Sequence, residues 1–340
     1  MQSFVFSDKT KEKQYKYGSN KKNIKIVNSQ SYIKNDFFLL TNDELTLITE
    51  VLKCKKSDIL NISALKKGMT NRSFLFSVQN KKYIIRVPGK GTEQLINRNH
   101  EAIIYKTISG YGICDDPIYI NPINGYKITL FLENARVCNP KNKKDTKKCI
   151  NKLKEFHSMK FQVDNTFDIY EQIDFYEKLR KGIPSIYQDY KDTKNKIFSL
   201  RKFIDKQPKD WCLSHIDAVP DNFLFYMTDQ GEKLQLTDWE YSGMQDPHID
   251  IAMFIIYSYY NKNEADWFID TYFDKKCTPL IRAKIYCYIA VCGLLWSNWA
   301  EYKTSLGIEF DEYGLKQYNY AKNFYKYAKK EINQYSNLEE

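Results

Sequence analysis

The stretch Trp211–Glu240 holds two aspartates and an asparagine that could act together on a phosphate. Asp217 and Asn222 are separated by four residues, and Asp238 follows near the end of the same stretch. Each lies beside an apolar run of the kind that forms β-strands. Phosphoryl transfer from a nucleotide needs one carboxylate to orient and deprotonate a hydroxyl. It also needs an amide and a second carboxylate that hold Mg²⁺ against the phosphates. The stretch therefore predicts this chemistry.

A polar loop earlier in the chain could hold the nucleotide. It precedes a predicted hairpin, and a glycine in it allows close approach of the backbone to a phosphate. The side chains that could contact phosphate oxygens lie around that glycine. The loop residues concerned are Gly68, Thr70, Asn71 and Ser73. Taken alone, the loop also fits an ordinary polar turn.

A basic residue and an acidic residue follow the loop in the order expected of a kinase small lobe. Arg86 lies near the end of the second strand of the hairpin, and Glu101 lies on the next predicted helix. A carboxylate in that position can hold the guanidinium by a bidentate pair. Each residue alone would be read as surface charge, but loop, basic strand and acidic helix together favour a nucleotide site.

The pattern of elements changes at about residue 135, from mixed strands and helices to mainly helices. Before it we expect strands at 73–78, 83–87 and 126–132, and helices at 97–108 and after a capping box that begins at Thr41. After it we expect helices at 150–159, 170–180, 192–205, 247–260, 265–273, 280–302 and 313–333, interrupted by a hairpin at 222–237. This pattern predicts an α+β fold with a lobe boundary near 135.

Composition sets the size of the core and the class of partner. A chain of 340 residues, 43% of them hydrophobic, can bury one large core or two smaller ones. The net charge is +10, from 52 Lys and Arg against 42 Asp and Glu. The lysines are spread through polar segments and the arginines do not cluster, so we expect solvated surface charge and no nucleic-acid binding.

No run reaches the about 18 apolar residues of a membrane span. The longest, Ile285–Trp296, predicts a buried helix, and the first residues are polar and rich in lysine rather than signal-like. We therefore expect a cytoplasmic protein without membrane insertion. The eight cysteines are scattered without a CxxC pair, which favours reduced thiols over a zinc or iron–sulfur site.

Several longer strings resemble the choline/ethanolamine kinases, and most closely the bacterial choline kinases of the phosphocholine-decoration type. They are GMTNRSF at 68–74, YIIRVPGKGTEQLINR at 83–98, EFHSMK at 155–160, HIDAVPDN at 215–222, TDWEYSGMQDPHIDIA at 237–252 and WSNW at 296–299. The resemblance implies a two-lobed protein-kinase-like fold of the aminoglycoside-phosphotransferase branch. It implies a small antiparallel-sheet N-lobe at 41–135 that binds the nucleotide and a large, mainly helical C-lobe at 136–335, after an extension at 1–40.

The resemblance also implies roles for individual residues. Asp217 would be the catalytic base, while Asn222 and Asp238 would hold Mg²⁺. His215 would support the loop, and we expect it to be structural, with Asp250 bonding the loop backbone. The residues that would contact ATP are Gly68, Thr70, Asn71, Ser73, Arg86, Glu101, Phe131 and Leu132, the last two from a hinge at 130–133 beside the adenine.

The substrate pocket is implied by the same resemblance. A quaternary ammonium is best held over aromatic faces, and Trp296 and Trp299 lie on nearly the same face of a predicted helix. Core packing is the ordinary interpretation of such a pair, but this family places it in the choline pocket. Further candidate walls are Tyr241 and Tyr257, with Tyr260 and Tyr320 as weaker ones. Tyr257 stands where eukaryotic relatives have a glutamate, so the anionic part of the site stays open between Asp217, Glu240 and another acidic residue.

These observations predict ATP- and Mg²⁺-dependent phosphorylation of choline to phosphocholine, with ADP released. A kinase for ethanolamine, another small amino alcohol or an aminoglycoside is the first alternative. A catalytically silent kinase-like binding protein is the second. The sequence leaves the oligomeric state open.

Overall fold

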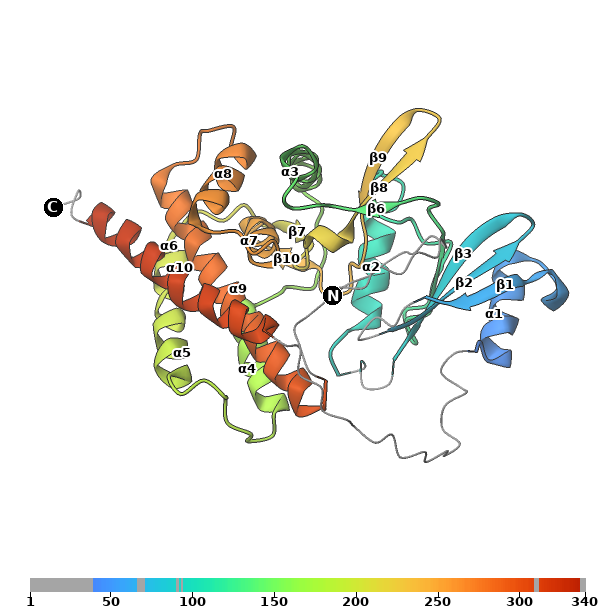
Figure 1. The fold of residues 1–340 in the computed structure, drawn as a ribbon, viewed down its shortest axis with the longest axis horizontal. Helices are drawn as coiled ribbons and strands as arrows, with labels where there is room; N and C mark the ends of the chain where they lie inside the picture. Colours follow the sequence, from blue (N-terminus) through green and yellow to red (C-terminus); the bar gives the residue numbers. More distant parts are fainter. Residues whose placement is uncertain (1–38, 66–70, 90–91, 93, 309–311, 337–340) are drawn as a thin grey trace, which may run out of the picture.

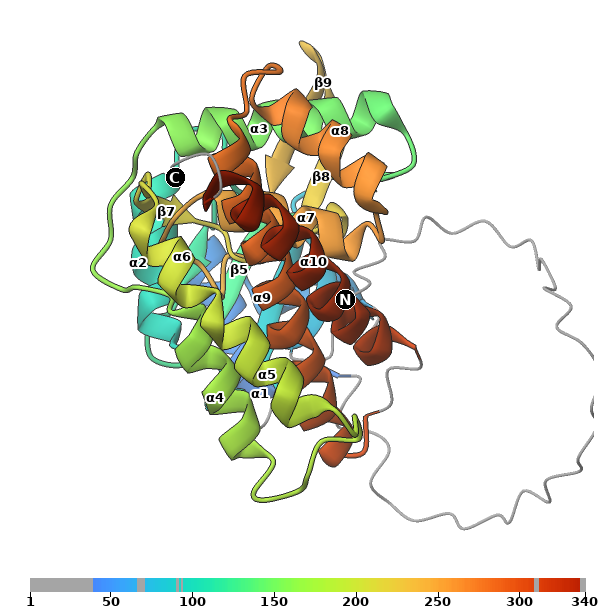
Figure 2. The ribbon, with the colours of Figure 1, turned by 90° about the vertical axis from the view of Figure 1, so that its left-hand side faces the viewer.

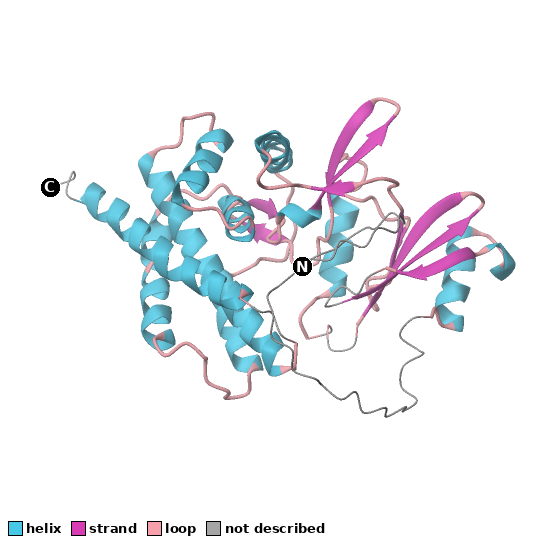
Figure 3. Ribbon diagram, viewed as in Figure 1, coloured by secondary structure: helices cyan, strands magenta, loops and turns pink. Residues whose placement is uncertain are grey.

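The computed structural model describes residues 39–65, 71–89, 92, 94–308 and 312–336 (Figure 1). The predictions for Gly68 and Thr70, and nearly all of the predicted extension at 1–40, lie outside these ranges. The described chain forms a β-rich part and a larger helical part, as Figure 3 shows.

A five-stranded antiparallel sheet forms the N-lobe, in the order β1-β2-β3-β5-β4. Its strands are β1 (Leu60–Ala64), β2 (Asn71–Val78), β3 (Lys81–Pro88), β4 (Tyr119–Ile120) and β5 (Lys127–Leu130). The turn between β2 and β3 has positive φ at Gln79 (49°) and Asn80 (63°). Two successive residues of that conformation match the right-handed twist of a hairpin. The predicted hairpin is confirmed.

Two helices accompany this sheet. Helix α1 (Asn42–Leu52) begins with the predicted capping box, in which Thr41 and Glu44 bond each other's backbone N–H groups. It lies at the outer end of the sheet, beside β1, whereas α2 (Arg98–Ile108) lies between the sheet and the helical part (Figure 1). A short 3-10 turn, η1 (Lys56–Asp58), precedes β1.

The C-lobe is mainly helical, as predicted. Its helices are α3 (Lys143–Ser158), α4 (Ile169–Leu179), α5 (Tyr190–Ser199), α6 (Arg201–Lys206), α7 (His248–Tyr257), α8 (Lys262–Tyr272), α9 (Pro279–Ser305) and α10 (Tyr313–Ser336). The single helix predicted at 192–205 is wrong in detail. Leu200 N–H bonds Ile197 O at 3.1 Å, one residue short of the α-helical partner, and this tighter turn separates α5 from α6.

Helix α9 is the centre of the large core. Figure 2 shows α10 running alongside it. By length and composition α9 could cross a membrane, but 83% of its most apolar window is buried inside the protein. The prediction of a buried helix at Ile285–Trp296 is confirmed.

Two small sheets frame the predicted catalytic stretch. Strand β7 (Cys212–Ser214) pairs antiparallel with β10 (Gly243–Gln245), and β8 (Phe223–Thr228) pairs with both β6 (Arg136–Val137) and β9 (Gly231–Leu236). A 3-10 turn, η2 (Pro220–Asn222), leads directly into β8. The segments 215–222 and 237–242 are therefore fixed at both ends by strands.

The buried apolar residues fall into two clusters. The smaller one joins Ile48 of α1 to Phe74, Phe76 and Ile85 of the N-lobe sheet. Ile104, Tyr105 and Ile108 of α2 belong to the larger cluster, which also takes in Ile113 and Cys114 after that helix and fills the C-lobe. Helix α2 thus follows the N-lobe strands in sequence but packs with the C-lobe, and it is the element through which the two lobes meet.

Candidate active site

The catalytic loop, defined here as His215–Asn222, is held in place by Asp250, which lies near the start of α7. The two carboxylate oxygens of Asp250 accept hydrogen bonds from the backbone N–H groups of His215 (2.9 Å) and Ile216 (2.8 Å). His157 on α3 adds a third contact to the same carboxylate, at 3.0 Å. The expectation that Asp250 bonds the loop backbone is confirmed.

Ile216 has a conformation that its side chain disfavours. Its φ is 67°, in the left-handed region that β-branched residues rarely adopt. Such backbone persists only where surrounding contacts impose it, and it concentrates at functional sites. Here the Asp250 carboxylate fixes the N–H groups of His215 and Ile216, which both precede the strained N–Cα bond of Ile216, so the chain is held on the side of that bond opposite to Asp217.

His215 connects the catalytic loop to the segment that carries Asp238. Its Nε2 lies 3.0 Å from the Thr237 carbonyl oxygen, and its ring lies against Trp239 at a centroid distance of 4.4 Å. Burial lowers the pKa of His215 to about 4, so the imidazole is neutral near pH 7. These contacts agree with a structural role for His215.

Asp217 and Asn222 contact each other across the catalytic loop. The Asn222 side-chain amide donates to the Asp217 carbonyl oxygen (2.9 Å) and to its Oδ2 (3.2 Å). Asp217 Oδ1 is buried and accepts no hydrogen bond within the described residues. Burial raises the pKa of Asp217 to about 6, and the Glu240 charge adds to this. Asp217 thus keeps one carboxylate oxygen ready for a hydroxyl.

The carboxylate of Asp238 is near enough to that of Asp217 for their charges to interact. Burial raises its pKa to about 6, with Arg86 opposing the shift and Asp217 adding to it. Its φ of 66° again lies in the left-handed region, which residues other than glycine seldom adopt. Asp217 is buried and Asp238 is half-buried, and interacting carboxylates with raised pKa values are common at functional sites.

The donor set fits Mg²⁺. The amide nitrogen of Asn222 is committed to Asp217, which leaves the amide oxygen for a metal, and Asp238 offers a carboxylate. No group of three or more His, Cys, Asp or Glu that could hold a metal by itself occurs in the described part of the chain. A hard cation held by few protein oxygens and completed by nucleotide phosphates is the usual arrangement for Mg²⁺.

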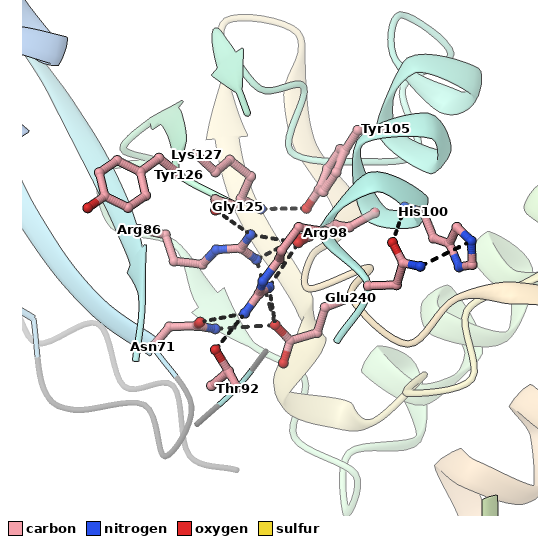
Figure 4. Close-up of polar contacts among 12 residues, drawn as sticks. Asn71, Arg86, Thr92, Arg98, His100, Tyr105, Gly125, Tyr126, Lys127 and Glu240 are labelled. Carbon is pink, nitrogen blue, oxygen red and sulfur yellow. Dashed lines mark hydrogen bonds and ion pairs between the residues drawn. The ribbon is translucent and has the colours of Figure 1, made fainter. Parts of the chain in front are cut away.

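Arg86, labelled in Figure 4, forms with Glu101 the buried pair that the sequence predicts. The two guanidinium nitrogens of Arg86 donate to the two oxygens of Glu101 at 2.6 and 2.8 Å. Burial opposes both charges. Nevertheless, the paired Arg86 lowers the pKa of Glu101 to about 2, and Glu101 keeps the pKa of Arg86 above its usual range. Both groups therefore stay charged near pH 7.

Arg98 joins the two lobes and was not among the predicted residues. Its Nη1 donates to Glu101 (3.0 Å) and to Glu240 Oε2 (3.1 Å), and its Nη2 donates to Asn71 Oδ1 (3.3 Å). Asn71 in turn donates to Glu240 Oε2 at 3.3 Å. Figure 4 shows these side chains meeting at one point. The i,i+3 spacing of Arg98 and Glu101 on one helix was the available signal.

Glu240 has a different environment from the one expected of a substrate ligand alone. Its Oε2 is used by Arg98 and Asn71, while its Oε1 is buried and has no hydrogen-bond partner in the described ranges. Burial raises the pKa of Glu240 to about 7, and the Asp238 charge adds to this. One oxygen therefore ties the lobes together and the other remains available.

The remaining predicted nucleotide contacts lie along the N-lobe sheet. Ser73 on β2 pairs in register with Arg86 on β3. Phe131 follows β5, and its N–H donates to the Lys82 carbonyl at 2.9 Å, so this N–H extends the sheet. An adenine contact from the predicted hinge would thus come from the Phe131 carbonyl or from Leu132, and it stays a prediction.

An aromatic cluster, defined as Tyr241, Tyr257, Trp296, Trp299 and Tyr313, lies beside the catalytic loop. The ring of Trp296 contacts those of Tyr241, Tyr257 and Trp299 at centroid distances of 5.7, 6.2 and 5.6 Å. Tyr313, at the start of α10, contacts Tyr257 at 5.7 Å and Trp299 at 6.4 Å. Tyr313 was not among the predicted residues. Four predicted side chains from three separate segments come together here.

Tyr320 does not join this cluster. Its hydroxyl donates to the Tyr260 carbonyl oxygen at 2.7 Å, and its ring stacks on Phe324 at 5.8 Å. None of the ring contacts found within the described residues connects it to Trp296 or Trp299. It lies about two helical turns beyond Tyr313 on α10. Its prediction as a pocket wall is not supported by this position.

Comparison with known proteins identifies the family. The family model for choline/ethanolamine kinases matches residues 62–335. The chain belongs to the choline/ethanolamine kinase family.

Individual relatives agree with this assignment. Protein LicA of Haemophilus influenzae is 27% identical over 266 residues, which are 75% of this chain and 77% of that protein. The crystal structure of choline kinase LicA from Streptococcus pneumoniae has a TM-score of 0.71 and 30% identity, and covers 83% of this chain and 98% of that one. A structure of LicA in complex with AMP has a TM-score of 0.70 and 29% identity, with the same coverage. The predicted kinase-like fold and the predicted class, a phosphotransferase, are confirmed.

Arg98 gives a first test of how this kinase couples its lobes. Arg98→Met keeps the aliphatic stem but removes the donors to Glu240 and Asn71. Because Asn71 begins β2 directly after the predicted phosphate loop, we expect KM for Mg·ATP to rise about tenfold and KM for the acceptor to change less. Steady-state kinetics with each substrate varied would measure this. Arg201→Met, which removes a half-exposed arginine paired with Asp168, is the matched control. Equal effects of the two variants would contradict the coupling.

Proposed function

We propose that this kinase phosphorylates the hydroxyl of choline with Mg·ATP, giving phosphocholine and ADP. The observation that carries the proposal is the position of the aromatic cluster. Tyr241 follows Asp238 by three residues, and its ring lies against Trp296. The charge of Asp217 adds to the burial that raises the pKa of both Tyr257 and Tyr313. Aromatic faces suited to a cation without N–H donors thus lie near the proposed catalytic base, which supports the proposal.

In the proposed reaction, Asp217 Oδ1 accepts the proton of the choline hydroxyl. The hydroxyl oxygen forms a bond to the γ-phosphorus of ATP as the bond from that phosphorus to ADP breaks. The partnerless oxygen and the fixed backbone of the catalytic loop support this role. Asn222 and Asp238 would hold Mg²⁺, which supplies charge neutralisation for the phosphates. Arg86, kept charged by Glu101, would contact the same phosphates. We also propose that the enzyme acts in the cytoplasm.

Ethanolamine is the second candidate acceptor, and Glu240 is the reason. Its buried Oε1 lies next to Tyr241 in sequence and has no donor within the described residues. A primary ammonium could donate a hydrogen bond to that oxygen, whereas a trimethylammonium could only be attracted to its charge. The aromatic cluster favours choline, because it offers faces rather than acceptors.

A coupled assay of ADP release decides between the acceptors. The purified protein would be supplied with Mg·ATP and, separately, choline, ethanolamine and an aminoglycoside panel. We expect the highest kcat/KM for choline. Absence of choline-dependent turnover would refute the proposal, and a higher kcat/KM for ethanolamine would transfer it to the second candidate. Omission of Mg²⁺ should abolish turnover.

The aromatic cluster is tested by a substitution that replaces one aromatic ring with an apolar, non-aromatic side chain. In Trp299→Leu the pocket loses one indole face, which at a desolvated cation–π site corresponds to about 1–2 kcal/mol. We therefore expect KM for choline to rise about tenfold, with KM for ATP unchanged. Trp211→Leu is the control, because Trp211 is 45% exposed and lies outside the cluster. A Trp299→Leu enzyme with normal choline KM would remove this indole from the pocket.

A further inference from the structure

Lys303 differs from the other buried lysines in its surroundings. The buried lysines of the described chain are Lys127, Lys284 and Lys303. Lys127 Nζ lies 2.9 Å from Asp115, and Lys284 Nζ lies 2.6 Å from Asp246. Buried lysines are normally paired in this manner. Lys303, with 4% exposure, has no ion pair within the described residues.

The contact that Lys303 does make is with the aromatic cluster. Its Nζ lies 5.6 Å from the centroid of Trp299, within the range of a cation–π interaction. Trp296, Trp299 and Lys303 are spaced by three and four residues on α9, so they lie along one face of the helix. Burial lowers the pKa of Lys303, and the Glu240 charge acts against that shift.

The carboxylate closest to Lys303 in sequence is used elsewhere. Glu301 accepts hydrogen bonds from Arg180 (2.5 Å), Ser185 (2.8 Å) and the Ile186 N–H (2.7 Å). Glu240 Oε2 is bound to Arg98. The ammonium of Lys303 therefore contacts an indole and forms no ion pair within the described residues, and Glu240 acts on it only through its charge.

We propose that the Lys303 ammonium is a resident cation of the choline pocket, which the trimethylammonium of the substrate must displace or tolerate. This inference rests on the proposed function, since it takes the aromatic cluster as the choline site. A like charge near the bound substrate costs Coulomb energy, and loss of the Trp299 contact costs more. Lys303 thus weakens choline binding and sets the choline concentration at which the enzyme responds.

The test is a gain of affinity, which damage to the fold would not produce. Lys303→Met keeps the length of the side chain and removes its charge. We expect KM for choline to fall about three- to tenfold, with KM for ATP unchanged. Tetramethylammonium, which has no hydroxyl to phosphorylate, should bind by calorimetry more tightly by a similar factor. Lys303→Arg keeps the charge and should stay near the wild-type values.

Lys316→Met is the matched control for net charge. Lys316 Nζ also lies over a tyrosine ring, that of Tyr259 at 4.9 Å, but on the surface and outside the aromatic cluster. Unchanged or weaker tetramethylammonium binding by Lys303→Met would overturn the inference. If that variant does not fold, Lys303→Gln carries the same expectation. Failure of wild-type enzyme to turn over choline would instead refute the proposed function, so the two failures are distinguishable.

Discussion

Replacement of Asp217 by asparagine should lower kcat by about a thousandfold or more, while the affinity for Mg·ATP stays within about threefold. A positioned general base contributes roughly 10²–10⁴-fold to a rate. Asparagine keeps the size of the side chain. Its amide oxygen can still accept the hydrogen bond from the Asn222 amide, which in the wild-type protein joins Asn222 Nδ2 to Asp217 Oδ2 at 3.2 Å. It cannot take the proton of the acceptor hydroxyl. The loss should therefore appear in kcat rather than in nucleotide binding.

Two measurements separate this result from a general defect. Single-turnover phosphoryl transfer reports the chemical step, and calorimetry with Mg·ATP reports binding. Asp229→Asn is the control, because Asp229 is an exposed aspartate in the turn between β8 and β9. An Asp217→Asn enzyme that loses ATP affinity but keeps the chemical step would show that Asp217 serves the nucleotide, and the base would have to be sought elsewhere.

The parts of this site that sequence could reveal are those encoded by neighbouring residues. Asp217, Asn222 and Asp238 lie in one stretch, and the Arg86–Glu101 pair follows from the order of a strand and the next helix. Hairpin signals and helical periodicity depend on residues a few positions apart. These features were therefore within reach of the sequence alone.

What escaped prediction depends on contacts between distant segments. Arg98 and Glu240 are 142 positions apart, and no local pattern joins them. Tyr313 begins a helix whose spacing indicates an apolar face but not which neighbour that face meets. Tyr320 was expected in the pocket, yet the packing of α10 places its hydroxyl on Tyr260. The register between helices is a tertiary property, so these positions needed the structure.

Glu240 shows how the two halves of the site depend on each other. It lies between Asp238, a proposed magnesium ligand, and Tyr241, a wall of the aromatic cluster. Its Oε2 accepts from Arg98 of α2 and Asn71 of β2. A movement of the N-lobe would therefore displace Glu240, which lies between the proposed metal site and the proposed acceptor site. Glu240 therefore connects α2 and β2 of the N-lobe to the segment that carries Asp238 and Tyr241.

The strained catalytic loop leads to the second large effect, on stability. In Asp250→Ala, the N–H groups of His215 and Ile216 lose their acceptors, and both residues are completely buried. Each buried donor left without a partner costs about 1–3 kcal/mol. The left-handed φ of Ile216 would also lose the contacts that impose it. We expect the free energy of unfolding to fall by about 3–5 kcal/mol.

Urea unfolding of the purified variants would measure this fall. Asp274→Ala is the control, because it also removes a carboxylate, but one paired with Lys154 at the surface, where such pairs contribute about 0–1 kcal/mol. Asp250→Asn keeps one oxygen acceptor and should lie between the two. Because Asp217 follows Ile216 directly, kcat of Asp250→Asn should fall as well, although Asp250 is completely buried. An Asp250→Ala enzyme as stable as Asp274→Ala would mean that the loop holds its conformation without this carboxylate, and the strain at Ile216 would then need another source.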